Sequence, residues 1–302
     1  MFALWVALTV LCLLEAVVSI YLNLGIVFIY TRSWMKRPKL NPSSLIHLVM
    51  GANNFTMRFS RIVDDLCPWL PGMFESGFYK ITVVLLGFNL YFSYWLTAWL
   101  CAYYCLIITN LSHQLVVSIK RILSAYLPYW LCLTGVWSLA IAVVYFYFTE
   151  MDTLVQHDMG NTLYSISTEN DNITSIYTFL AASLGSGLPF IRITFFLLVT
   201  VVVLLKHAQH MGNTGSNVQV HITTIQTMVL FFIASTLFLI CDLNIVINSY
   251  NDNDLMTVIS WYVIALFPTL EAIIIIHASP KLKKIFPFCA GGILGRLRTC
   301  LG

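Results

Sequence analysis

The sequence predicts an all-α membrane protein, a bundle of seven transmembrane helices with the N-terminus outside the cell and the C-terminus in the cytosol. The first observation is composition: 59% of the 302 residues are hydrophobic and only 10% are charged, whereas a soluble domain carries about 25% charged residues. The second is that the hydrophobic residues come in blocks, most of which reach the roughly 20 residues that a spanning helix needs. The third is that basic residues gather in alternate loops, which indicates the orientation.

The apolar blocks predict the helices in order along the chain. They cover residues 4–30, 44–66, 79–110, 125–149, 176–206, 222–248 and 257–278, and a cytosolic tail follows over residues 279–302. The first block lacks a basic leading segment and continues to Tyr30, too long for a signal peptide, so we expect it to be the first spanning helix. Only short polar stretches separate the blocks. We therefore expect one seven-helix domain over residues 1–302, with its function inside the bundle or at its two mouths.

Loop charge predicts which side of the membrane each connection faces. Twelve of the 16 basic residues lie in the first, third and fifth connections and the tail: Arg32, Lys36, Arg37, Lys39, Lys120, Arg121, Lys206, Lys281, Lys283, Lys284, Arg296 and Arg298. Ten of the 13 acidic residues lie in the other connections: Asp64, Asp65, Glu75, Glu150, Asp152, Asp158, Glu169, Asp171, Asp252 and Asp254. Because basic loops stay in the cytosol, the tail is expected inside and the N-terminus outside. The sequon at Asn172 then lies in an outside loop, where we expect a glycan.

Ionisable residues inside the predicted helices are costly and by default indicate function. They are Glu15, Arg58, Arg61, Arg192, Asp242 and Glu271. On the second helix Arg61 and Asp65 are spaced to pair at i,i+4, so local neutralisation explains this group as well as function does.

The other ionisable residues have no partner on their own helix. Arg192 is expected just inside the outer end of the fifth helix, where it either lines a pocket or extends to the headgroups. Glu15 and Asp242 have no partner that the sequence names.

Aromatic residues and prolines distinguish the third, fifth and seventh helices. The third helix is dense in aromatic residues, and Trp95 and Trp99 share one of its faces at i,i+4. Such a stripe indicates packing more often than a ligand site. Pro189 and Pro268 predict bends in the fifth and seventh helices, because a proline frees a backbone carbonyl of the preceding turn.

Motifs of other function classes are missing from the sequence. The loops contain no HExxH, GxSxG or GxxxxGK[ST] run and no paired carboxylates, so we expect neither an enzyme nor a cofactor. The eight cysteines form no CxxC pair or Cys/His cluster, which argues against a metal site. The seventh helix has no lysine for a retinal Schiff base. The sequence shows no repeated halves like those of transporters, and we expect no nucleic-acid partner.

Several helix ends together carry a family resemblance. These are Trp34–Arg37, Trp95–Ala98, Ile108–His113, Leu188–Phe190, Lys206–Met211, His221–Met228 and Ser279–Lys283. In this order they resemble the bitter taste receptors, the type 2 taste receptor family of G-protein-coupled receptors, over nearly the whole chain. The Asp-Arg-Tyr and NPxxY runs of rhodopsin-like receptors are missing, as they are in bitter receptors.

The sequence departs from that family at two positions. The family usually has arginine where Asn54 stands and His-Ser where Glu271 and Ala272 stand, whereas Asn23 matches a family asparagine. The resemblance implies that Asn23, Asn54 and Glu271 form an activation network in the bundle core, with a protonated Glu271 bonded to both asparagines. The departures indicate a divergent, non-mammalian branch.

The resemblance implies a plasma-membrane receptor that detects small bitter compounds and activates a gustducin-type heterotrimeric G protein. The ligand is expected to enter from outside between helices two, three, five, six and seven. Trp95 corresponds in this comparison to a tryptophan that lines the family's pocket. By their positions in the same comparison, we also expect four further residues to bind the ligand: Trp99, Arg192, Phe238 and Trp261.

The G protein is expected to meet the inner ends of helices three, five and six. The residues there are His113, Lys120, Arg121, His207, His210, Met211 and His221, which also suit anchoring at the cytosolic face. One alternative is a vomeronasal type 1 pheromone receptor, a family that usually lacks the KHxxxM pattern ending the fifth helix. An alternative from another class is a small multi-helix transporter, which would move solute without activating a G protein.

Overall fold

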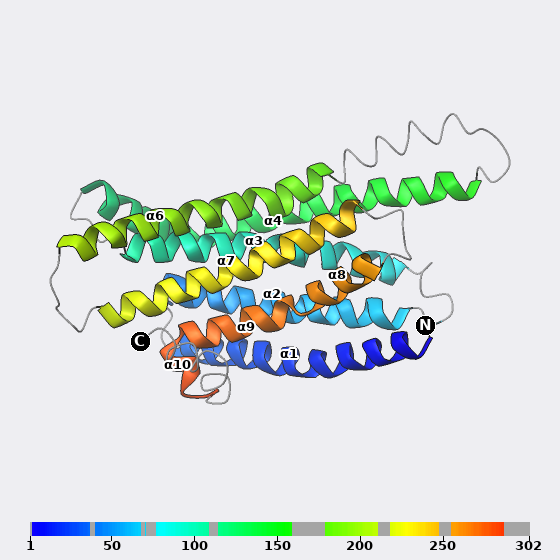
Figure 1. The fold of residues 1–302 in the computed structure, drawn as a ribbon, viewed down its shortest axis with the longest axis horizontal. Coiled ribbons are helices and arrows are strands. Elements are labelled where there is room, and N and C mark those ends of the chain that lie inside the picture. Colours follow the sequence, from blue (N-terminus) through cyan, green and yellow to red (C-terminus); the bar gives the residue numbers. More distant parts are fainter. Residues whose placement is uncertain are drawn as a thin grey trace.

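The computed structural model describes residues 2–36, 40–67, 70, 77–108, 114–158, 179–210, 218–247 and 255–286. Within these ranges the chain forms helices and no β-strand, and the long helices lie side by side along the longest axis (Figure 1). Six segments are long and apolar enough to cross a membrane: Val10–Lys36, Gly77–Ile108, Arg121–Tyr147, Phe179–Val203, Thr223–Ile245 and Met256–Ala278. The chain is therefore a multi-pass membrane protein.

The second helix differs in composition from these six segments. It is α2 (Pro42–Leu66), which lies in the bundle in contact with α1 (Phe2–Lys36) and α3 (Gly77–Ile108). Its last turns carry both arginines and both aspartates of the helix, so its apolar stretch is short. The helical bundle is confirmed, whereas a seventh membrane crossing and the outside position of the N-terminus stay predictions.

The fourth helix, α4 (Gln114–Asp158), is longer at both ends than the predicted range 125–149. The hydrophobic block marked only the part suited to hydrocarbon. Residues 114–124 and 150–158 contain neither proline nor glycine, so nothing in them ends the helix. Pro128 lies inside α4 without interrupting it.

The fifth predicted helix has an irregular beginning. Described helix starts at residue 179, passes through the π-helical segment η2 (Ser183–Gly187) and continues as α6 (Leu188–His210). The backbone N–H of Leu188 donates to the carbonyl of Ser183, five residues back, which is the wide turn of a π-bulge. The irregularity predicted at Pro189 therefore falls in the turn just before it. The sixth predicted helix is α7 (Val218–Ile247).

The seventh predicted helix is two helices, α8 (Leu255–Ala265) and α9 (Phe267–Ala278). The interruption lies at Leu266, two residues before Pro268, as the proline predicted. A short helix, α10 (Pro280–Lys283), follows in the predicted tail, and its first turn is capped by the Ser279 hydroxyl, which accepts from the backbone N–H of Leu282.

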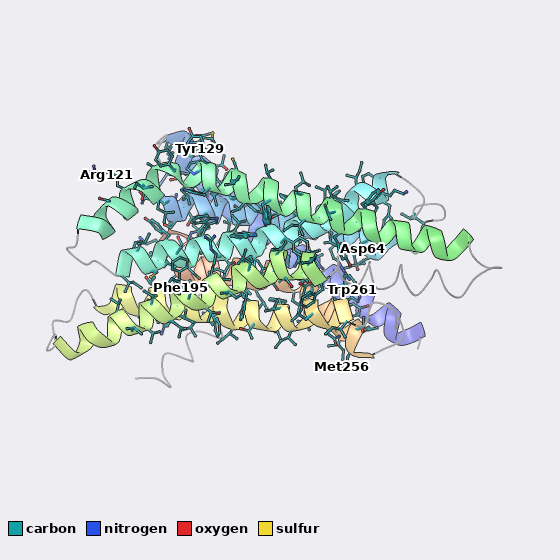
Figure 2. All side chains as sticks on the ribbon, turned by 90° about the horizontal axis from the view of Figure 1, so that it is seen from above. Asp64, Arg121, Tyr129, Phe195, Met256 and Trp261 are labelled. Atoms are coloured by element: carbon teal, nitrogen blue, oxygen red, sulfur yellow. The ribbon has the colours of Figure 1, made fainter. Side chains whose placement is uncertain are left out.

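The two ends of the bundle differ in charge. At the basic end lie the end of α1, the beginning of α4 and α10, with Lys36, Arg121 and Lys281. At the acidic end, where α1 begins, α2 finishes with Asp64 and Asp65. Figure 2 shows Arg121 and Asp64 in opposite halves of the molecule.

Candidate functional site

A carboxyl group lies at the centre of the bundle. Glu271 of α9 is fully buried and accepts hydrogen bonds from two hydroxyl groups of α3, Ser93 at 2.6 Å and Thr97 at 3.0 Å. The contact ties the last spanning segment to the central helix. Both oxygens of the carboxyl group are satisfied, as a buried polar group requires.

The two asparagines of the predicted activation network are also fully buried, but they take different partners. The Asn54 side chain is a hydrogen-bond partner of the Glu271 carboxyl group, and its amide oxygen lies 3.5 Å from the Ser93 hydroxyl. Asn23 instead donates to two backbone carbonyls, that of Ser19 at 2.9 Å and that of Pro268 at 3.3 Å. Among the described residues no hydrogen bond joins Glu271 to Asn23, and the activation role of the three residues stays a prediction.

An ion pair links α1 to α2 where the sequence named no partner for Glu15. The guanidinium of Arg58 lies 2.6 Å from the Glu15 carboxylate, and Arg58 is almost fully buried. Thr269 of α9 donates to the same carboxylate. Arg58 also donates to the backbone carbonyls of Cys12 and of Ala265, the latter at 3.3 Å.

The second arginine of α2 is neutralised on its own helix. Arg61 lies 3.2 Å from Asp65 and 3.4 Å from Asp64, which confirms the predicted i,i+4 pair and adds an i,i+3 pair. Its guanidinium also stacks over the Trp261 ring of α8, 5.0 Å from the ring centroid. Figure 2 shows Trp261 on the same side of the molecule's middle as Asp64, toward the acidic end.

A cavity of about 120 Å³ lies in this half of the bundle, between α2, α3, α4, α7, α8 and the start of α9. We call it the axial cavity. Its lining is Met57, Arg58, Arg61, Val83, Leu86, Gly87, Leu90, Tyr91, Ala142, Tyr145, Phe146, Asp242, Ile245, Trp261, Ile264, Ala265 and Pro268. The walls are therefore mostly apolar and aromatic, with two arginines and one buried aspartate as the charged residues.

The aspartate of the axial cavity, Asp242 of α7, faces the π-helical segment. It accepts a hydrogen bond of 2.8 Å from the Ser186 hydroxyl, and both residues are buried. The sequence singled out Asp242 as an ionisable residue but did not identify this partner. Ser186 lies in the π-turn before Pro189.

A second hollow, which we call the lateral groove, lies between α3, α4 and α6 and has a volume of about 560 Å³. Its lining is Trp95, Trp99, Ile122, Leu123, Trp130, Leu133, Thr134, Trp137, Leu188 and Arg192. The Arg192 guanidinium stacks over both Trp95 and Trp99, 5.2 and 5.6 Å from the ring centroids. Several lining side chains of α4 are exposed on the outer face of the bundle, so this groove opens toward lipid.

The five predicted ligand-binding residues do not line one cavity. Trp95, Trp99 and Arg192 lie in the lateral groove, whereas Trp261 lies in the axial cavity. Phe238 lines neither of the two and is fully buried against Phe267, with ring centroids 4.2 Å apart. Spacing on single helices could not separate the two hollows, because which face of α3 meets α4 is a property of the packing.

A hydrogen-bonded cluster at the basic end was missed by the sequence reasoning. The Tyr104 hydroxyl lies 3.3 Å from Nε2 of the buried His47, and the Tyr30 hydroxyl lies 3.0 Å from Nδ1. Tyr30 donates onward to the Ser279 hydroxyl at 3.1 Å. Because the Tyr30 hydroxyl donates its proton to Ser279, it can only accept a hydrogen bond from His47. This arrangement fits a neutral His47 that carries its proton on Nδ1 and accepts from Tyr104 at Nε2. The signal in the sequence that could have indicated this cluster was His47, a single histidine within the second predicted helix.

The described residues among those expected to face the G protein lie toward the basic end of the bundle. Arg121 is exposed near the beginning of α4. Lys120, His207, His210 and His221 lie in described helices, whereas His113 and Met211 lie outside the described residues, as does the sequon at Asn172. Their proposed roles stay predictions.

Comparisons of the sequence with known proteins match it to one family along most of its length. A family model for taste receptor protein (TAS2R) matches residues 1–289. Taste receptor type 2 member 16 of Pongo pygmaeus is 22% identical over 283 residues, 91% of this chain and 94% of that protein. Taste receptor type 2 member 50 of Homo sapiens is 22% identical over 299 residues, 94% of this chain and 96% of that protein. Identities this low agree with a divergent sequence, and the non-mammalian origin stays a prediction.

Proposed function

Because the chain belongs to the taste receptor (TAS2R) family of G-protein-coupled receptors, we propose that it detects small bitter compounds and activates a gustducin-type heterotrimeric G protein. Members of the family are receptors rather than enzymes. The N-terminus and the acidic end would face outside, and the basic end would face the cytosol, in keeping with the distribution of lysine and arginine. The bilayer is the third partner, since the chain crosses it several times.

The observation that carries the proposal is the axial cavity. It lies toward the acidic end, and its aromatic and aliphatic walls suit small apolar molecules, with Arg61 and Asp242 as polar anchors. At about 120 Å³ it is smaller than the roughly 300–1,000 Å³ of typical ligand pockets. An agonist would therefore favour a wider state of the bundle, which is how a ligand shifts a population.

The wall of the axial cavity offers a route to the basic end. Pro268 and Ala265 line the cavity and flank the interruption between α8 and α9. One turn after Pro268, Glu271 holds α9 to α3, and Ser279 at the end of α9 joins the His47 cluster. Widening the cavity would move α9 relative to α3, and the displacement would reach the surface where the G protein binds.

The test is calcium release in cells that express the chain with a promiscuous, gustducin-tailed G-protein α subunit, screened against a panel of bitter compounds. We expect a response, and we expect Trp261→Ala to raise the half-maximal concentration about tenfold or more, since losing an aromatic wall and its contact with Arg61 removes at least about 1.4 kcal/mol. Silence across a broad panel with surface expression confirmed would contradict the bitter assignment.

Trp95→Ala is the matched tryptophan variant, because Trp95 lines the lateral groove instead. A response lost in Trp95→Ala and kept in Trp261→Ala would move the agonist site to the groove. Activation of the G protein by ligand also separates this receptor from a transporter, which would show solute flux in its place. A response to pheromone-like compounds alone would favour the vomeronasal alternative.

A further inference from the structure

The lateral groove contains a cation that no described residue neutralises. Arg192 is exposed on α6, and its interactions in the described part of the chain are the two contacts with the rings of Trp95 and Trp99. The other arginines inside the bundle, Arg58 and Arg61, each pair with a carboxylate. Arg192 differs from them in having no counter-ion among the described residues.

Arg192 lies within the apolar segment Phe179–Val203 of the fifth predicted helix. A charged side chain inside a spanning helix is costly unless it is paired or reaches the headgroups. A compensating negative group in the groove would lower this cost. The expected position just inside the outer end of the helix stays a prediction.

Arg192 is the one ionisable side chain in the lining of the groove. The hydroxyl of Thr134, also in the lining, donates to the backbone carbonyl of Trp130 at 2.9 Å and is already satisfied. The rest of the lining is aliphatic and aromatic. The groove thus presents one positive charge between apolar walls.

We propose that the lateral groove binds a single-chain amphiphilic carboxylate, such as a long-chain fatty acid, that enters from the bilayer and pairs its carboxylate with Arg192. A planar carboxylate accepts two parallel hydrogen bonds from a guanidinium group. A groove of about 560 Å³ with apolar walls has room for one hydrocarbon chain. A phospholipid is a poorer fit, because it carries two hydrocarbon chains and the groove has room for one.

The test uses the purified full-length receptor in phosphatidylcholine nanodiscs and a palmitate analogue with a photoreactive diazirine on its chain. We expect saturable labelling of α3, α4 and α6 peptides, read by mass spectrometry. Excess palmitate should compete with the probe, and methyl palmitate, which has no carboxylate, should not. This comparison needs no variant, agonist or G protein, so its failure is distinguishable from failure of the proposed taste function.

Substitutions of Arg192 test whether this residue binds the carboxylate. Arg192→Gln should reduce labelling at least tenfold, and Arg192→Lys should retain part of it. Arg121→Gln is the matched control, because it removes an exposed positive charge next to the lining residue Ile122 without touching Arg192. An unchanged unfolding temperature would show that Arg192→Gln is folded.

Five outcomes would overturn the proposal. Methyl palmitate could compete as well as palmitate, or labelling could survive Arg192→Gln. Labelling that is lost in Arg121→Gln but kept in Arg192→Gln would place the carboxylate at the membrane surface. Competition by phosphatidylglycerol would make a phospholipid the occupant, and a receptor dimer that remains unlabelled would mean that a second copy of the chain covers the groove.

Discussion

Arg58 joins three segments at one point of the molecule. It pairs with Glu15 of α1 and donates to the carbonyl of Ala265 at the end of α8. That carbonyl has no usual helical partner, because the N–H of Thr269, four residues on, donates to Leu266 instead. The buried charge on α2 therefore satisfies a backbone group that the interruption before Pro268 releases.

Removing Arg58 should destabilise the bundle. Arg58→Gln leaves Glu15 without its counter-ion and is expected to cost about 3 kcal/mol, since a buried pair that loses one partner leaves an uncompensated charge. Thermal unfolding of the purified receptor measures the change. Arg61→Gln is the comparison and should cost less, because Arg61 is more exposed than Arg58. Equal unfolding temperatures for Arg58→Gln and the parent chain would contradict this role.

The carboxyl group of Glu271 should matter as a hydrogen-bond acceptor. Glu271→Leu removes the partner of both Ser93 and Thr97 and is expected to cost about 2 kcal/mol, at about 1 kcal/mol for each hydrogen bond. Glu271→Gln keeps an acceptor oxygen and should cost less. Unfolding temperatures of the two variants check the difference, and a glutamine variant as unstable as the leucine variant would show that the charge itself is required.

At the scale of elements, the interruption between α8 and α9 is held from two sides. Arg58 binds the carbonyl of Ala265, and Asn23 of α1 donates to the carbonyl of Pro268. Thr269, directly after the proline, donates to Glu15. The bend is therefore supported by α1 and α2, and it lies in the wall of the axial cavity.

Straightening this bend should weaken the response to agonist. Pro268→Ala restores a backbone N–H, which favours a continuous helix over α8 and α9 and reshapes the cavity wall. We expect the half-maximal agonist concentration to rise about tenfold at unchanged surface expression, measured in the calcium assay. Pro128→Ala is the control, because Pro128 lies exposed within α4 and outside the lining of both hollows. An unchanged half-maximal agonist concentration in Pro268→Ala would show that agonist binding does not depend on the bend.

At the scale of the whole molecule, the charge difference between the two ends predicts one orientation. An N-terminal epitope tag should bind antibody on intact cells, whereas a C-terminal tag should bind only after permeabilisation, because basic loops stay in the cytosol. Asn172→Gln should also lower the apparent mass by one glycan. The reverse pattern of tag exposure would contradict the proposed placement of both the axial cavity and the G-protein surface.

The amino-acid sequence by itself determined the fold class, the approximate helices and the family. Those features depend on local quantities: the length of each apolar block, the charge of each loop and short runs at helix ends. The Arg61–Asp65 pair and the interruption near Pro268 were predictable for the same reason, since both depend on neighbours within one helix.

Only the tertiary structure decided which side chains meet across helices. Glu15 and Arg58 are 43 positions apart in the chain, and Trp95 and Trp261 line different hollows although both were assigned to one pocket. Helical periodicity places a residue on a face, but the rotation of each helix against its neighbours decides what that face contacts. That rotation results from the packing of all the helices together, so no single segment of the sequence contains it.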